Sequence, residues 1–93
     1  MTVRQVEVVN QLGLHARAAA KFVHLATRFQ AQVRVAHQTR QIDGKSIMGI
    51  LLLAAAQGAI IEISAEGFDE KAAVDALSEL VQTGFGEEMS CGA

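Results

Sequence analysis

The sequence predicts an α+β fold in which an antiparallel sheet carries helices on one side. Segments with hydrophobic residues at every second position alternate with segments that repeat them every three or four, in the order β-α-β-β-α-β-α. Each expected helix has one hydrophobic stripe, and each expected strand has one hydrophobic face. Elements that bury a single face need only one covering layer, so we expect all the helices on the same side of the sheet.

The first half of the chain contains three expected strands and one helix. Residues 3–9 form a strand because valines alternate there with polar residues. Residues 16–29 form a helix, and residues 31–36 and 38–43 form two short strands, the second of which ends in the turn Asp43-Gly44. The buried stripe of the helix consists of Phe22, Leu25, Ala26 and Phe29.

The second half contains two expected helices with a strand between them. Ser46 is placed to cap a short helix over residues 47–57, which Gly58 ends. Residues 59–65 form the last strand, and Asp69 is expected to cap the last helix. The stripe of that helix consists of Val74, Leu77, Leu80 and Val81.

Composition limits the domain organisation and excludes some classes of protein. The chain has 93 residues, so we expect one domain over residues 1–86 and a disordered tail over residues 87–93. A net charge of -2 argues against nucleic-acid binding. The longest apolar run, residues 47–56, is too short to span a bilayer, so no membrane insertion is expected.

The cysteine and histidine content indicates the compartment and argues against a metal site. Cys91 is the only cysteine, so no disulfide can form within one chain, and the beginning of the chain does not resemble a signal peptide. We therefore expect a cytoplasmic protein. His24 and His37 are too scattered to suggest metal binding, and no cofactor is implied.

A candidate phosphate site lies at the start of the first helix, in the stretch "GLHAR". His15 is the expected N-cap, and the free N–H groups of Ala16, Arg17 and Ala18 point toward its ring. Such a helix start attracts anions, and a guanidinium at Arg17 can bind phosphate oxygens. A neutral imidazole is also a good nucleophile. The corner thus suits a histidine that accepts a phosphoryl group, with His15 and Arg17 as the reactive pair.

Other interpretations of this corner remain open. A single histidine at a helix start is often only a cap or a solvated side chain. A role as general base has less support, because no serine, cysteine or carboxylate lies close in the sequence to act with it.

Three segments together resemble the HPr family, the histidine-containing phosphocarriers of the bacterial phosphoenolpyruvate-dependent phosphotransferase system. They are "NQLGLHARAAAKF", "DGKSIMGILLLAAAQG" and "IEISAEGFDEKAAVDALSELV". The resemblance covers roughly residues 3–85, and the combination of "GLHAR" with "GKSIMGI" is its most specific part. It implies an open-faced β-sandwich, with a four-stranded antiparallel sheet and three helices on one face.

The resemblance also implies residue roles. His15 matches the histidine that enzyme I phosphorylates on Nδ1 and that passes the group to a histidine of an enzyme IIA domain. Arg17 matches the residue that contacts the phosphoryl group. Ser46 matches a serine that an ATP-dependent HPr kinase/phosphorylase modifies in some bacteria. The family binds no cofactor of its own, and its members are carriers rather than stand-alone enzymes.

We expect two docking regions and a monomer, because a carrier must expose its site to successive partners. The basic side chains of Arg17, Lys21, His24 and Arg28 fall on one face of the first helix and suit an acidic partner. In the short helix, Ile47, Met48 and Leu51 are expected to form an exposed apolar patch beside Lys45.

One departure and two alternatives complete the sequence analysis. Ala18 stands where family members usually have proline, which restores an N–H in the first helical turn. The phosphotransferase output is expected to be sugar uptake, but a regulatory branch such as the nitrogen-related chain is an alternative. A non-catalytic binding module that acts through Ser46 and the apolar helix is the alternative of another class.

Overall fold

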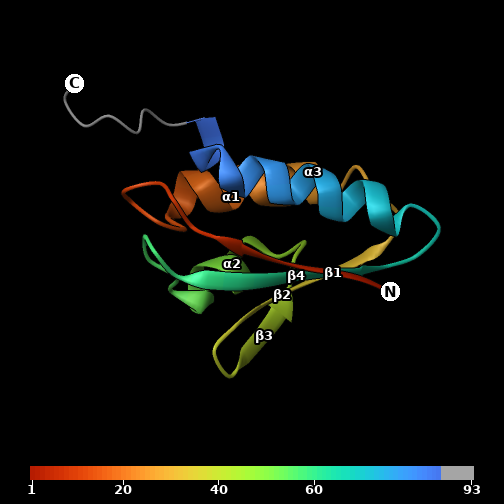
Figure 1. Cartoon of the computed structure of the whole chain (residues 1–93), viewed down its shortest axis with the longest axis horizontal. Helices are drawn as coiled ribbons and strands as arrows, with labels where there is room; N and C mark the ends of the chain where they lie inside the picture. The colour runs from red at the N-terminus through yellow and green to blue at the C-terminus, as the bar shows by residue number, and fades with distance from the viewer. Residues whose placement is uncertain (87–93) are drawn as a thin grey trace.

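A computed structural model describes residues 1–86 of the chain. It contains four strands and three α-helices in the predicted order, followed by one 3₁₀ turn (Figure 1). The elements are β1 (Thr2–Glu7), α1 (Ala16–Ala26), β2 (Gln32–His37), β3 (Arg40–Asp43), α2 (Ile47–Leu53), β4 (Ile60–Glu66), α3 (Glu70–Gln82) and η1 (Gly84–Gly86).

The four strands form one antiparallel sheet in the order β1-β4-β2-β3. In this register Val6 lies opposite Ile61, while Val35 lies between Ile63 and Ile42. These paired residues share one face of the sheet, because side chains alternate along a strand. The strand ends differ from the expected ones by one or two residues, since pairing with a neighbour decides where a strand ends.

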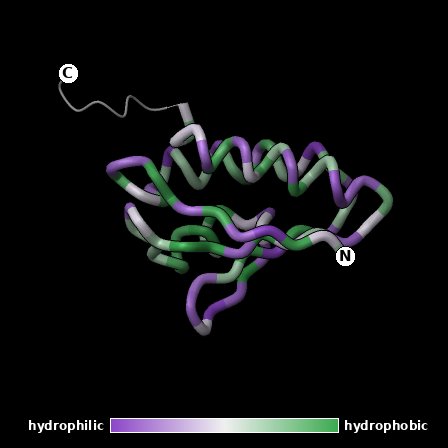
Figure 2. The backbone as a smooth tube through the Cα atoms, in the orientation of Figure 1, coloured by the Kyte–Doolittle hydropathy of each residue, from purple (hydrophilic) through white to green (hydrophobic). Residues whose placement is uncertain are grey.

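All three helices cover this hydrophobic face, which confirms the expected open-faced sandwich. Figure 1 shows α1 and α3 along the sheet, and α2 packs against α1 and β3. Figure 2 shows hydrophobic and hydrophilic residues alternating along both layers. The core between the layers contains Phe22 of α1, Ile50 of α2 and Leu77 of α3, all buried.

Helix α1 ends at Ala26 rather than at the expected Phe29. Thr27 is its C-cap, and the next two residues make short-range bonds, from Arg28 N to Leu25 O and from Phe29 N to Ala26 O. The carboxylate of Asp69 accepts from the backbone N–H groups of Gln30 and Ala31, which a continued helix would direct to its own carbonyls. The hydrophobic stripe therefore continues to Phe29, which is half-buried, although the helix does not.

The expectation that the side chain of Asp69 caps α3 is wrong. Asp69 does occupy the N-cap position, but its side chain makes no capping bond. Its two oxygens accept from the backbone N–H groups of Gln30 and Ala31, each at 2.9 Å. Asp69 thus joins the connection before α3 to the connection before β2, which are far apart in the sequence.

Helix α2 ends at Leu53, four residues earlier than predicted. Ala54 caps it with a left-handed backbone, at φ 53°. The guanidinium of Arg40 donates to Leu52 O at 2.6 Å and satisfies a carbonyl at this end of the helix. Gly58 does not end α2. It forms part of the turn before β4, at φ 91°.

None of the helices in residues 1–86 is both long and apolar enough to cross a lipid bilayer. The expected tail over residues 87–93, with Cys91, lies outside the described residues.

Candidate functional site: the start of helix α1

His15 occupies the N-cap of α1, as the sequence predicted. Its backbone is extended, and its carbonyl accepts the first bond of the helix, from Ala19 N at 2.8 Å. The ring is half-buried, and Nδ1 accepts from the backbone N–H of Arg17 at 3.3 Å. An accepting ring nitrogen carries a lone pair, so the neutral ring has its proton on Nε2.

This geometry places a nucleophilic nitrogen at the positive end of a helix. The first N–H groups of α1 have no acceptor within the helix, and the helix dipole favours an anion beside them. The Arg17 side chain is exposed in the same turn. If Nδ1 bonded to phosphorus, the N–H of Arg17 would become available to a phosphoryl oxygen.

The loop before His15 is anchored to the connection between α2 and β4. Leu14 is buried, and its N–H donates to Ala55 O at 3.1 Å. Gly13 has a left-handed backbone at φ 67°, and a Cβ there would lie 2.7 Å from the same oxygen. The backbone just ahead of His15 therefore rests directly against another segment, which fixes where α1 begins.

The basic side chains of α1 lie where the sequence placed them, with one difference. Arg17, His24 and Arg28 are exposed. Lys21 is exposed as well, but its Nζ donates to the carbonyl of Phe85 at 2.7 Å, beyond the end of α3. The last three of these basic residues rim a shallow hollow of about 270 Å³ between α1 and α3, which is lined by Lys21, His24, Leu25, Arg28 and Leu80.

The apolar patch on α2 differs by one residue from the expected patch. Ile47 and Met48 are exposed, at 41% and 65%, as predicted. Leu51 is half-buried and packs against the core, so its expected exposure was wrong, and Leu52 is exposed instead, at 54%. A short helix turns its side chains by 100° per residue, and only tertiary packing shows which leucine faces solvent.

Ser46 and Lys45 precede this patch. The Ser46 hydroxyl accepts from Gly49 N at 3.0 Å, which confirms the predicted N-cap. Lys45 donates from Nζ to Phe29 O at 2.7 Å, so its ammonium ties α2 to the end of α1.

Comparison with known proteins identifies the family. A family model described as "PTS HPr component phosphorylation site" matches residues 2–83. The chain belongs to the HPr family. HPr proteins are phosphocarriers of the phosphotransferase system, and "Phosphocarrier protein HPr" of Neisseria meningitidis serogroup A is 45% identical over 87 residues, covering 94% of this chain and 98% of that one.

Solved HPr structures confirm the fold. The structure of HPr-C-His from Thermoanaerobacter tengcongensis has a TM-score of 0.91 and 44% identity, covering 95% of this chain and 99% of that one. A structure described as an HPr dimer from the same organism has a TM-score of 0.75 and 44% identity, covering 94% of this chain and 100% of that one. The expected monomer therefore stays a prediction for this HPr chain.

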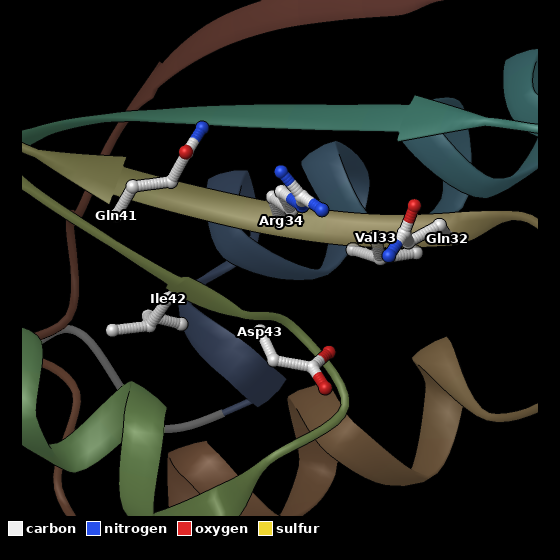
Figure 3. Close-up of a pocket in the computed structure, with 6 residues that line it drawn as sticks. All are labelled: Gln32, Val33, Arg34, Gln41, Ile42 and Asp43. Carbon is white, nitrogen blue, oxygen red and sulfur yellow. The ribbon is translucent and has the colours of Figure 1, made fainter.

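A second hollow, of about 330 Å³, lies on the β2–β3 ribbon of this HPr protein (Figure 3). Arg34 lies opposite Asp43 in the strand register, and Gln32 and Gln41 line the same hollow. None of these residues belongs to the loop that carries His15. Within residues 1–86, no three His, Cys, Asp or Glu side chains gather as metal ligands would.

Proposed function

We propose that His15 carries the phosphoryl group in this HPr protein. Its Nδ1 attacks the phosphorus held on a histidine of enzyme I. A bond from Nδ1 to phosphorus forms while the donor's nitrogen–phosphorus bond breaks, and the proton on Nε2 of His15 stays in place. A histidine of an enzyme IIA domain then takes the group in sugar uptake. The observation that carries this proposal is the hydrogen bond that His15 Nδ1 accepts from the backbone N–H of Arg17 at the N-terminus of α1.

Arg17 and the first N–H groups of α1 stabilise the transferred group. The phosphoryl oxygens carry most of the negative charge during transfer, so preorganised N–H donors and a guanidinium lower the barrier. Because His15 is half-buried at an open corner, the group stays accessible to the acceptor. A carrier needs this balance, since a deeply enclosed phosphohistidine would not be passed on.

The basic face of α1 and the apolar patch of α2 are the proposed docking surfaces for enzyme I and enzyme IIA. Arg17, His24 and Arg28 would attract an acidic partner and speed its association. Ile47 and Met48 would bury apolar surface against it. Lys21 and Lys45 would act through the backbone carbonyls that they hold, which keeps both surfaces in place.

Ser46 is the proposed regulatory site, modified by an HPr kinase/phosphorylase where the host has one. Its hydroxyl now accepts from Gly49 N and lies directly before Ile47 and Met48. Phosphorylation would place about two negative charges at the edge of the apolar patch. Docking on an acidic partner should then weaken.

The test is phosphoryl transfer from phosphoenolpyruvate, with enzyme I and magnesium, to the wild type and to His15→Ala. The proposal predicts an acid-labile, base-stable adduct on the wild type only. His24→Ala is the matched control, because it removes a second imidazole, an exposed one within α1, and should still be labelled. Labelling of His15→Ala, or of neither protein with the host's own enzyme I, would reject the proposal.

The enzyme IIA that accepts the phosphoryl group decides whether the protein serves sugar uptake or the regulatory branch. We expect the phosphorylated protein to transfer its group to a sugar-specific enzyme IIA faster than to a nitrogen-type enzyme IIA. The reverse preference would assign the protein to the regulatory branch.

A further inference from the structure

The loop between β1 and α1 is held at both of its ends by the connection between α2 and β4. At its start, Val8 donates to Ala59 O at 2.8 Å and accepts from Gly58 N at 2.7 Å. At its end, Leu14 N donates to Ala55 O at 3.1 Å. The few residues between these anchors decide how the chain enters α1 and therefore how the ring of His15 is presented.

Asn10 is a polar residue of this loop that is fully buried, with 0% of its surface exposed. Its Nδ2 donates to Gly13 O at 2.7 Å. The N–H of Gly13 donates back to the backbone carbonyl of Asn10 at 3.1 Å. Two bonds between the same two residues close the turn, one through the side chain and one through the backbone.

The acceptor of the Asn10 side chain belongs to the peptide group that joins Gly13 to Leu14. The oxygen of that group is held by Asn10 Nδ2, and its N–H is held by Ala55 O. A peptide group is planar, so fixing its oxygen and its N–H fixes the orientation of the whole plane. This plane lies one residue before His15, and it leaves few directions in which the helix can start.

We propose that Asn10 is a positioning residue for phosphoryl transfer, which sets the orientation of His15 against the N–H of Arg17. The inference rests on the proposed function of His15 and deepens it. Asn10 is fully buried within the loop and acts through the Gly13–Leu14 peptide, so it does not itself contact the phosphoryl group. A shift of the reacting nitrogen by about 1 Å can lower a transfer rate by about 100-fold.

The experiment compares Asn10→Ala and Asn10→Asp with Ser78→Ala. Asn10→Asp keeps the shape of the side chain but replaces the Nδ2 donor with an oxygen. Ser78→Ala is the matched control because Ser78 is another buried polar residue, which lies in α3 and outside the His15 loop. Circular dichroism first establishes that each variant is folded. Asn10→Ala leaves a cavity and Asn10→Asp buries a carboxyl group, so the two variants endanger folding in different ways, and whichever of them folds decides the question.

Two readouts separate positioning from general stability. In the unphosphorylated protein, NMR measures the amide proton of Arg17 and the ¹⁵N shift of His15 Nδ1. Single-turnover transfer from phosphorylated enzyme I then gives the saturating rate constant and the half-saturating concentration. Both Asn10 variants should move the two shifts and lower the saturating rate constant about 10- to 100-fold, with the half-saturating concentration unchanged. Ser78→Ala should change none of these.

Folded Asn10 variants with wild-type shifts and a wild-type rate constant would overturn the inference. So would a loss confined to the half-saturating concentration, because that would make Asn10 part of partner binding. If the wild type accepts no phosphoryl group, the proposed function of His15 fails by itself. The NMR shifts would still decide whether Asn10 orients the ring.

Discussion

Replacing Gly13 with alanine should destabilise the protein through two separate costs. At φ 67° an L-residue is less stable than glycine by about 1–2 kcal/mol. The new Cβ would also lie 2.7 Å from Ala55 O and 3.0 Å from the Cα of Ala56, both backbone atoms that cannot turn aside. Forcing an atom into a packed site costs about 1–3 kcal/mol. Together the expected loss is about 2–5 kcal/mol of unfolding free energy.

Gly58→Ala is the matched control because it carries the first cost without the second. Gly58 also has a positive φ, at 91°, but a Cβ there meets nothing within 4 Å. Urea unfolding of both variants and the wild type gives the two losses directly. We expect Gly13→Ala to lose about 1–3 kcal/mol more than Gly58→Ala. Equal losses would refute the close approach of the His15 loop to Ala55.

Four further predictions concern other parts of the molecule. Within the described residues, Ser78 Oγ is buried without a hydrogen-bond partner, so Ser78→Ala should raise the unfolding free energy by about 1 kcal/mol in a urea titration. Ala18→Pro should still be phosphorylated in the enzyme I assay, because the first helical turn tolerates proline; loss of labelling would mean that α1 starts elsewhere. The hydrogen bond from Arg4 lowers the pKa of Asp75 below its ordinary 3.8. The ionised Asp75 carboxylate therefore stabilises the folded protein above pH 3.8, and this contribution is lost as the pH falls through the lowered pKa. Asp75→Asn should weaken this fall of the unfolding free energy at acid pH, measured by urea titrations at several pH values. An unchanged fall would contradict the ion pair between Arg4 and Asp75. Met48→Glu should raise the half-saturating concentration of enzyme I and leave urea unfolding unchanged, as expected for an exposed docking residue.

The sequence predicted the layers of the fold because hydrophobic periodicity records which face of each element is buried. It could not predict where α1 and α2 end. Asp69 is distant in sequence from Gln30, and Arg40 donates to Leu52 O only because the β2–β3 hairpin folds beside α2. Neither contact leaves a local pattern. Ala54 likewise adopts a left-handed backbone, a conformation that alanine seldom adopts and that the sequence therefore does not indicate.

The candidate site was predictable to the extent that it is local. His15, Arg17 and the first helical turn are adjacent in the sequence, and capping rules suffice to place them together. Asn10 was missed as a functional residue, although an Asn three positions before Gly13 is a recognisable turn signal. The loop that contains Asn10 is held at both ends by the connection between α2 and β4, a contact that only the folded structure shows.

The two lysines of the predicted docking surfaces show the same limit. Helical spacing placed Lys21 on the basic face, and sequence position placed Lys45 beside the apolar patch. The carbonyls that they hold belong to Phe85 and Phe29, each in another element or its flanking turn. Spacing along one helix cannot reveal such partners.

The most direct test is to locate the phosphorus on the protein after reaction with enzyme I and phosphoenolpyruvate. NMR of the ¹⁵N-labelled protein would show which ring nitrogen couples to ³¹P, and whether the amide of Arg17 shifts at the same time. We predict phosphorus on Nδ1 of His15, with the Arg17 amide proton moving downfield as its bond passes from Nδ1 to a phosphoryl oxygen. Phosphorus on Nε2, or on His24 or His37, would contradict the role that we assign to the start of α1.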